Sequence, residues 1–255
     1  MTLAALGIDV GSTATKLVGV TAAGDIAWRR LAPTAPRIEA QAEALLAEAR
    51  AQPGGERAPT VATGYGRKLV ASATRALTEI TCHARGVYRR TGRAGTLVDI
   101  GGQDSKVILI GAQGQVLHFV MNDKCAAGTG RFLEVTAGRL QLPVAEMGDM
   151  ARAATAEVPI SSTCTVFAES EIVSLLARGT PVEHVVRGLH RALVHRVTSL
   201  VRSLGPRPPY FLSGGVAHNA AVAAFLGEAL GAPVERAEEP QLMGAYGAAL
   251  SALEP

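Results

Sequence analysis

Two short segments of the 255-residue chain repeat one pattern of residues that could bind phosphate. Asp9–Lys16 reads DVGSTATK and Asp99–Lys106 reads DIGGQDSK, so aspartate, glycine, a hydroxyl residue and lysine recur at the same spacing. Glycine lets the backbone approach a phosphate, and the N–H groups of a tight turn can donate to it. Asp9 and Asp104 could hold Mg²⁺, which takes oxygen ligands and keeps several waters. Two such turns can bind one polyphosphate from opposite sides.

A single glycine turn of this kind more often just shapes a hairpin, but its repetition argues against that interpretation. The chain contains no G-x-x-x-x-G-K-[ST] segment, and no complete G-x-G-x-x-G segment. A third glycine segment, YFLSGGVAHN at Tyr210–Asn219, follows an apolar strand and opens a helix. Taken alone, it is equally well explained as an ordinary strand-to-helix turn.

The second candidate chemistry lies at two of the three cysteines. Cys125 lies in MNDKCAAGTGRFLEV and Cys164 in ISSTCTVFAESE, each just before an expected helix, and Thr129 is expected to cap the first of these helices. The positive end of a helix dipole favours a thiolate, and equally the negative charge of a reduced iron–sulfur centre. A lone cysteine in an apolar chain is, however, commonly a buried and inert thiol. Zinc is a further alternative, although a CxxC pair, its commonest signature, is missing.

Two thiols do not complete the four-cysteine set of an iron–sulfur cluster. A twofold dimer would double them and place one cluster on the symmetry axis, with Cys125 and Cys164 from each chain. The residues alone leave these alternatives open.

The elements that must position these segments form an α/β pattern with two similar halves. Apolar alternation and turn residues predict strands at 3–10, 16–20, 25–31, 60–65, 96–110 (interrupted by the second turn), 116–123 and 209–213. Helical spacing predicts helices at 38–49, 74–90, 128–140, 143–154, 168–178, 181–204 and 217–230, followed by a last strand and helix. The apolar face of the 168–178 helix and the residues before it is expected to comprise Val166, Phe167, Ile172, Val173, Leu175 and Leu176. We place one lobe at 1–92 and the other at 93–255, with the last helix able to pack back on the first lobe.

The composition excludes several classes of function. The formal net charge is only +3 and the basic residues are scattered, so neither nucleic acid nor an anionic membrane is expected as a partner. The N-terminus lacks the features of a signal peptide, and no apolar run is long enough to span a membrane, so we expect a soluble cytoplasmic protein. Three cysteines in a reducing compartment do not predict a disulfide framework.

The three glycine elements together resemble the ASKHA superfamily of acetate and sugar kinases, Hsp70 and actin. This resemblance implies two duplicated ribonuclease-H-like lobes with an ATP cleft between them. The implied nucleotide-binding residues are Gly11, Ser12, Thr13, Thr15, Lys16, Gly101, Gly102, Gly214, Gly215 and Val216. Asp9, Gln103 and Asp104 are the candidates for positioning the attacking water, without a basis for ranking them.

Longer segments resemble the activator (component A) of 2-hydroxyacyl-CoA dehydratases, in the BadF/BadG/BcrA/BcrD ATPase family that also holds the ATPase subunits of benzoyl-CoA reductase. They are GIDVGSTATKLV, ATGYGR, DIGGQDSKVI, MNDKCAAGTGRFLE, ISSTCTVFAESE, SGGVAHN and GAYGAAL, and they cover nearly the whole chain in order. The resemblance implies a homodimer with one [4Fe–4S] cluster between its subunits, held by Cys125 and Cys164 of each. It also implies that Gln241 lies on the nucleotide side, and that Cys82 is a packed helix residue.

The same resemblance implies an ATP-driven one-electron donor. Reduced ferredoxin or flavodoxin would supply the electron, and an iron–sulfur dehydratase or reductase would receive it. FAESEIVSLL, after Cys164, could act as a lever, although Glu169 and Glu171 could equally be solvated surface charges. Two alternatives stay open: an ATPase subunit of a benzoyl-CoA reductase, and a small-molecule kinase on the same fold that needs no iron–sulfur cluster.

Overall fold

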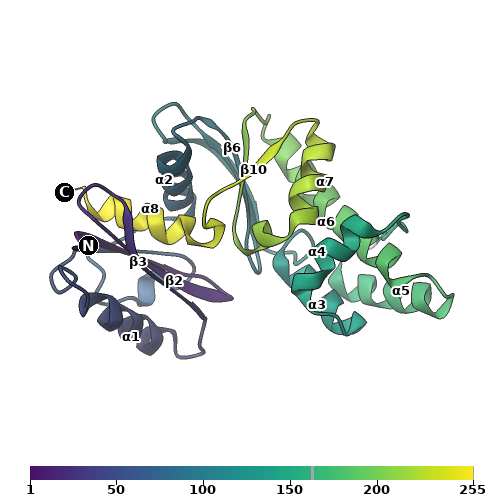
Figure 1. Cartoon of the computed structure of the whole chain (residues 1–255), viewed down its shortest axis with the longest axis horizontal. Helices are drawn as coiled ribbons and strands as arrows, with labels where there is room; N and C mark the ends of the chain where they lie inside the picture. The colour runs from purple at the N-terminus through teal and green to yellow at the C-terminus, as the bar shows by residue number, and fades with distance from the viewer. Residues whose placement is uncertain (162–163, 255) are drawn as a thin grey trace. The chain divides into compact units, whose positions relative to one another are not determined.

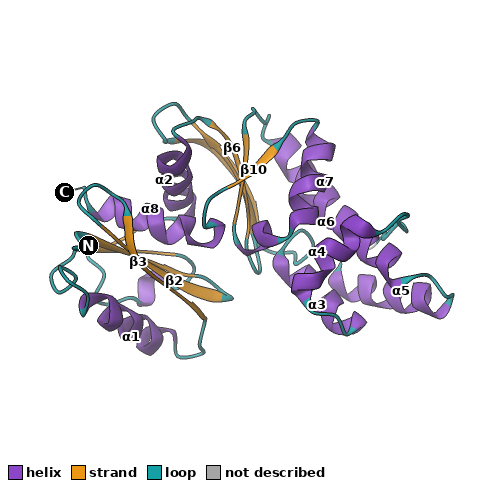
Figure 2. Cartoon of the chain, in the orientation of Figure 1, coloured by secondary structure: helices purple, strands orange, loops and turns teal. Residues whose placement is uncertain are grey.

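The computed structural model describes every residue except 162, 163 and 255, and contains two five-stranded sheets with helices around them (Figure 1, Figure 2). The chain divides into two compact units. Unit 1 comprises Met1–Ala94, Ile110–Leu117 and the C-terminal segment from Ala237 onward, and unit 2 comprises Gly95–Leu109 and His118–Arg236. The division expected between residues 92 and 93 lies two residues from the first of these boundaries.

Unit 1 is built on a sheet with the strand order β3-β2-β1-β4-β5. Its elements are β1 (Ala5–Val10), β2 (Ala14–Val20), β3 (Ile26–Pro33), α1 (Ile38–Arg50), β4 (Thr60–Thr63), η1 (Arg67–Leu69), β5 (Arg75–Ala76), α2 (Glu79–Thr91), η3 (Pro240–Leu242) and α8 (Met243–Ala252). The central strand β1 pairs antiparallel with β2 and parallel with β4. The C-terminal helix α8 packs on β1 and on α2.

Alternation along β1 decides which side chains meet which helix, because successive side chains of a strand point to opposite faces. Leu6, Ile8 and Val10 are buried in one hydrophobic core with side chains of α1. Asp9 therefore points to the other face, which α8 covers. The strand thus buries one apolar face while it presents a carboxylate near its carboxyl end.

Unit 2 repeats the same sheet with additional helices. Its elements are β6 (Gly95–Ile100), β7 (Ser105–Ile110), β8 (Val116–Asn122), α3 (Gly130–Leu140), α4 (Val144–Ala153), α5 (Thr165–Ala177), α6 (Val182–Ser203), β9 (Tyr210–Ser213), η2 (Gly215–His218), α7 (Ala220–Leu230) and β10 (Val234–Arg236). The end of β7 and the start of β8, within Ile110–Leu117, are grouped with unit 1. The strand order is β8-β7-β6-β9-β10, which matches the order in unit 1 strand for strand. The register matches as well, because Asp9 lies opposite Thr63 in β1 and β4, and Asp99 lies opposite Ser213 in β6 and β9. The α/β fold with two duplicated lobes is therefore confirmed.

Helices α3 to α7 lie on one side of the second sheet (Figure 1). The core beneath them joins Val98, Ile100 and Leu212 of the sheet to α6, whose long apolar face is buried along most of its length. None of the helices within the described residues is long and apolar enough to cross a membrane.

Three helix starts differ from the sequence-based expectation by three residues or more. The helix expected from residue 217 begins at Ala220, because the side chain of Asn219 caps it after the short helix η2. The helix expected at 74–90 begins at Glu79, because the short strand β5 precedes it and Thr78 accepts a hydrogen bond from the N–H of Thr81. The helix expected from residue 168 begins at Thr165, with Cys164 as its N-cap residue.

Candidate functional site

The first Asp-Gly turn lies between β1 and β2. Asp9 is 3% exposed, and its Oδ2 lies 3.0 Å from Nζ of Lys16. The N–H of Gly11 donates to the carbonyl of Ala14 at 3.1 Å, which closes the turn and leaves Ser12 exposed at its tip. The ammonium group of Lys16 and the exposed residue Ser12 thus lie at the same turn at the end of β1. A phosphate site requires such a combination of positive charge and turn donors.

Thr13 is also exposed at this turn, whereas Thr15 is buried. The hydroxyl of Thr15 lies 3.2 Å from the hydroxyl of Thr34, which in turn donates to the carbonyl of Gly11 at 2.7 Å. Thr15 therefore shapes the turn from beneath. Its direct contact with a phosphate stays a prediction.

The second Asp-Gly turn lies between β6 and β7 and holds a buried group of charges. Nζ of Lys106 lies 2.5 Å from Oδ2 of Asp104 and 3.6 Å from Oδ2 of Asp99. Asp99 also accepts a hydrogen bond of 2.7 Å from the hydroxyl of Ser213 in β9. Gln103 is exposed beside this group, where it can reach a ligand or a water.

Asp99, Lys106 and Ser213 were not among the candidates drawn from the sequence. The repeat itself carries the signal for the first two, because Asp99 and Lys106 occupy the places that Asp9 and Lys16 occupy in the first turn. Ser213 had no comparable signal, since it meets Asp99 only through strand pairing across 114 positions of the chain.

The third turn, Gly214–Val216, has a counterpart in unit 1 that the sequence reasoning missed. Gly214 has φ 86°, and a Cβ there would lie 2.3 Å from the carbonyl oxygen of Ile100. Gly64, in ATGYGR, has φ 91°, and a Cβ there would lie 2.4 Å from the carbonyl oxygen of Val10. Both glycines therefore pack a turn onto the end of the strand that carries the aspartate, and only glycine fits such a close approach at a positive φ. Gly215, the next residue of the third turn, is exposed.

Helix α3 begins directly on the second Asp-Gly turn. The N–H of Gly130 donates to the carbonyl of Gly101 at 2.8 Å, and the N–H of Arg131 donates to the carbonyl of Gly102 at 2.7 Å. These N–H groups belong to the first turn of a helix, where no intrahelical acceptor is available. Because a Cβ on Gly130 would lie 3.2 Å from Cγ2 of Val216, the start of α3 touches the third turn as well.

Cys125 lies in the loop that leads into α3. Asn122 braces this loop by donating from Nδ2 to the carbonyls of Cys125 at 2.7 Å and Ala127 at 3.1 Å. Thr129 occupies the N-cap position, but its hydroxyl donates to the carbonyl of Ala126 at 2.7 Å and makes no cap hydrogen bond. The prediction that Thr129 caps α3 through its side chain is therefore wrong. The carbonyls of the second Asp-Gly turn satisfy this helix end instead.

Cys164 is exposed at the start of α5, and its carbonyl accepts from the N–H of Ala168 at 2.9 Å. The apolar face predicted for this region is only partly correct. Ile172 and Leu175 are buried as predicted, whereas Val166, Phe167 and Val173 are 69%, 68% and 38% exposed.

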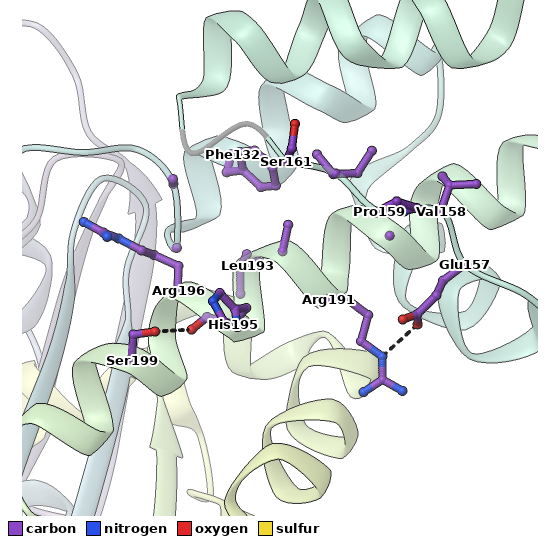
Figure 3. Close-up of a pocket in the computed structure, with 15 residues that line it drawn as sticks. Phe132, Glu157, Val158, Pro159, Ser161, Arg191, Leu193, His195, Arg196 and Ser199 are labelled. Carbon is purple, nitrogen blue, oxygen red and sulfur yellow. Dashed lines mark hydrogen bonds and ion pairs between the residues drawn. The ribbon is translucent and has the colours of Figure 1, made fainter.

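Both cysteine-bearing segments line one cavity of about 330 Å³ in unit 2 (Figure 3). Ala127 and Gly128 come from the Cys125 loop, and Ser161 comes from the segment before Cys164. Residues of α6, including Leu193 and Arg196, line it as well. The two thiols thus belong to neighbouring segments, although the described residues contain no group of three or more His, Cys, Asp and Glu side chains that could hold a metal ion.

Cys82 differs from the other two cysteines. It is fully buried in α2, and burial raises the pKa of its thiol to about 12, although a hydrogen bond with Thr63 lowers it in part. The prediction that Cys82 is a packed helix residue is confirmed. Gln241 lies half-buried in η3, and its contact with a nucleotide stays a prediction.

Comparison with known proteins gives these features a context. Residues 6–252 match the model of the BadF/BadG/BcrA/BcrD ATPase family. The chain is 39% identical over 252 residues to the 2-hydroxyisocaproyl-CoA dehydratase activator of Clostridioides difficile, covering 98% of this chain and 94% of that protein. It is 40% identical over 255 residues to the (R)-2-hydroxyglutaryl-CoA dehydratase activating ATPase of Acidaminococcus fermentans, covering 99% and 98%.

A solved structure agrees with these sequence relationships. The activator of the 2-hydroxyisocaproyl-CoA dehydratase from Clostridium difficile, with bound ADPNP, matches with a TM-score of 0.90 and 39% identity over 98% of this chain and 94% of that one. A benzoyl-CoA reductase subunit of Thauera aromatica is more distant, at 31% identity over 90% of this chain and 84% of that protein. A ROK family glucokinase from Streptomyces griseus matches with a TM-score of 0.64 and 16% identity, which shows a shared fold alone. The chain therefore belongs to the BadF/BadG/BcrA/BcrD ATPase family and is an ATPase.

Proposed function

We propose that this ATPase is a one-electron donor that activates a 2-hydroxyacyl-CoA dehydratase, and that two copies share one [4Fe–4S] cluster. The relatives at about 40% identity carry the names of such activators, whereas the benzoyl-CoA reductase subunit is more distant. The observation that carries the proposal is that the second Asp-Gly turn is connected through the start of α3 to the loop of Cys125 within unit 2. Helix α3 begins on the carbonyls of Gly101 and Gly102, and the loop before it carries Cys125.

In this proposal the residues of the three turns bind Mg-ATP. The first turn contributes Gly11, Ser12, Thr13 and Lys16, the second contributes Gly101, Gly102 and Gln103, and Gly214, Gly215, Val216 and Gln241 receive the nucleoside. Asp9 and Asp104 offer the hard oxygen ligands that Mg²⁺ takes, directly or through its waters. Because Lys16 and Lys106 each contact Oδ2 of one of these carboxylates, we assign the remaining oxygen of each to Mg²⁺ or its waters.

The thiols fit an iron–sulfur cluster in their chemistry. Cys164 is exposed and Cys125 is half-buried, so both can be reached, and each lies ahead of a helix whose N-terminal dipole favours negative charge. Cys125 and Cys164 would supply two of the four ligands, and a second copy of the chain the other two. A bound cluster would supply the one-electron redox couple. Reduced ferredoxin or flavodoxin is the proposed source of the electron.

Within the chain, Gly101 and Gly102 would transmit the state of the nucleotide. A change in the second Asp-Gly turn moves the two carbonyls that hold the start of α3, and thereby the loop braced by Asn122 around Cys125. ATP binding or hydrolysis can bias such an element only if the turn interacts differently with ATP and ADP.

An activation assay tests the function. The protein, purified and reduced without oxygen, is mixed with a purified 2-hydroxyacyl-CoA dehydratase of a relative's system, and dehydration of the acyl-CoA is followed with ATP, with ADP and without nucleotide. We expect turnover only with ATP. Turnover independent of nucleotide, or phosphorylation of a small metabolite by an iron-free protein, would contradict the proposal, and stable copurification with benzoyl-CoA reductase subunits would favour that alternative.

A further inference from the structure

Glu171 of α5 binds Ser161, which lies three residues before Cys164 in the sequence. The backbone N–H of Ser161 donates to Oε1 and Oε2 of Glu171 at 3.0 and 3.1 Å, and the hydroxyl of Ser161 donates to Oε1 at 3.1 Å. Hydrogen bonds to an ionised carboxylate are stronger than those between neutral groups. Glu171 is therefore a specific partner of Ser161 and not the solvated surface charge that it could have been from the sequence alone.

The backbone of Cys164 is joined to the same helix. Cys164 is the N-cap residue of α5, and its carbonyl accepts from the N–H of Ala168. Ser161 is thus hydrogen-bonded to the side chain of Glu171 in the second turn of α5. Cys164 is hydrogen-bonded to the backbone of the first turn. The carboxylate of Glu171 therefore holds Ser161, and the first turn of α5 holds the backbone of Cys164, against the same helix.

Ser161 also connects this segment to the rest of the site. It lines the cavity to which Ala127 and Gly128 of the Cys125 loop contribute (Figure 3). The position of Ser161 consequently affects the spacing between the two cysteine-bearing segments, which a shared metal centre must match.

Glu169, two residues earlier on the same helix, provides a contrast. Its carboxylate lies 3.6 Å from Nε of Arg139 of α3, and the two side chains are 44% and 48% exposed. Exposed ion pairs of this kind contribute little, because solvent screens them. Glu169 therefore has the same charge on the same helix as Glu171 but points to a different side of it, and within the described residues it makes no hydrogen bond to Ser161 or Cys164.

We propose that Glu171 is a positioning residue that fixes Cys164 in the geometry required of a metal ligand. The inference rests on the proposed function, since it assumes that Cys164 binds the iron–sulfur cluster. Groups that orient metal ligands typically change metal affinity about 10–100-fold when they are removed. Losing the Glu171 carboxylate should loosen Cys164 while it leaves the thiol and the nucleotide turns in place.

The test compares Glu171→Ala and Glu171→Gln with Glu169→Ala in the full-length protein, reconstituted with iron and sulfide without oxygen. The readout is the rate at which an iron chelator removes iron. We expect Glu171→Ala to lose iron at least about 10-fold faster than wild type. Glu171→Gln should lose it at an intermediate rate, because its amide oxygen still accepts from Ser161, and Glu169→Ala should match wild type.

Two further measurements separate the outcomes. Hydrogen exchange at the Ser161 amide should become faster in Glu171→Ala even in the iron-free protein, whereas ATP binding and the thermal unfolding transition should be retained. Iron loss at the wild-type rate in Glu171→Ala would overturn the inference and leave the proposed function standing. A wild-type protein that takes up no iron would instead overturn the proposed function, and the inference with it.

Discussion

Replacing Gly130 with alanine tests the connection between the nucleotide turns and the Cys125 loop. A Cβ at this position would lie 3.1 Å from the carbonyl oxygen of Gly101, 3.2 Å from Cγ2 of Val216 and 3.4 Å from Cα of Gly102. The first two distances are shorter than ordinary van der Waals contacts, and the first neighbour is backbone. The second Asp-Gly turn and the start of α3 must therefore move apart by a few tenths of an ångström.

The geometry sets the size of the expected effect. The movement weakens two hydrogen bonds, from Gly130 to Gly101 and from Arg131 to Gly102, each of which contributes about 0.5–1.5 kcal/mol. Loss of both would cost about 1–3 kcal/mol, so weakening them lowers a coupled binding constant by at most about 5–150-fold. Overall stability is a poor readout, because alanine favours the helix over glycine by about 1 kcal/mol and offsets part of the loss.

The assay measures ADP and ATP binding by calorimetry, and the redox potential of the reconstituted protein with and without nucleotide. In Gly130→Ala we expect weaker nucleotide binding and a smaller nucleotide-dependent shift in potential. Gly138→Ala is the matched control, because it lies in the same helix and a Cβ there would meet nothing within 4 Å. If Gly130→Ala binds nucleotide and shifts its potential as Gly138→Ala does, the connection through α3 is refuted.

Three other predictions follow from buried groups. Burial lowers the pKa of His190 below its ordinary value of 6.5, so the unfolded chain binds the proton more readily than the folded chain. The free energy of unfolding should therefore be constant above pH 6.5 and decrease below it. Denaturant unfolding of His190→Gln should show a smaller decrease. The thiol of Cys82 should resist alkylation in the native iron-free protein while the other two thiols react, because its pKa is raised to about 12. Rapid alkylation of all three thiols would contradict this prediction. Asp104→Asn removes the carboxylate bound to Lys106 and should slow Mg-ATP hydrolysis at least about 10-fold with bound iron unchanged, whereas loss of both would indicate misfolding.

Local patterns in the sequence predicted much of the fold and of the candidate site. A continuous apolar stretch predicted β1, alternating apolar residues predicted β2 and β3, and the repeated Asp-Gly pattern predicted the duplication that the two matching strand orders confirm. These features depend on residues close together in the chain, or on the repeat of a short segment.

The features that were missed depend on contacts between distant segments. Gly64 packs on the end of β1, and Ser213 bonds to Asp99, only because β4 and β9 pair with the central strands. The start of α3 meets Gly101 across 29 positions of the chain, so Thr129 had no need to cap the helix. Helical spacing also grouped Phe167 with the apolar face of α5, although a residue in the first turn of a helix can project beyond the core.

The central claim is that each chain carries half of an iron–sulfur site. Native mass spectrometry of the oxygen-free protein measures it most directly, with iron and sulfide analysis of the same sample. We predict a dimer that carries one four-iron cluster, and Cys125→Ala and Cys164→Ala proteins that lack it, since each change removes two of the four ligands. A complete cluster on a single chain, or an iron-free wild-type protein that still hydrolyses ATP, would contradict the account.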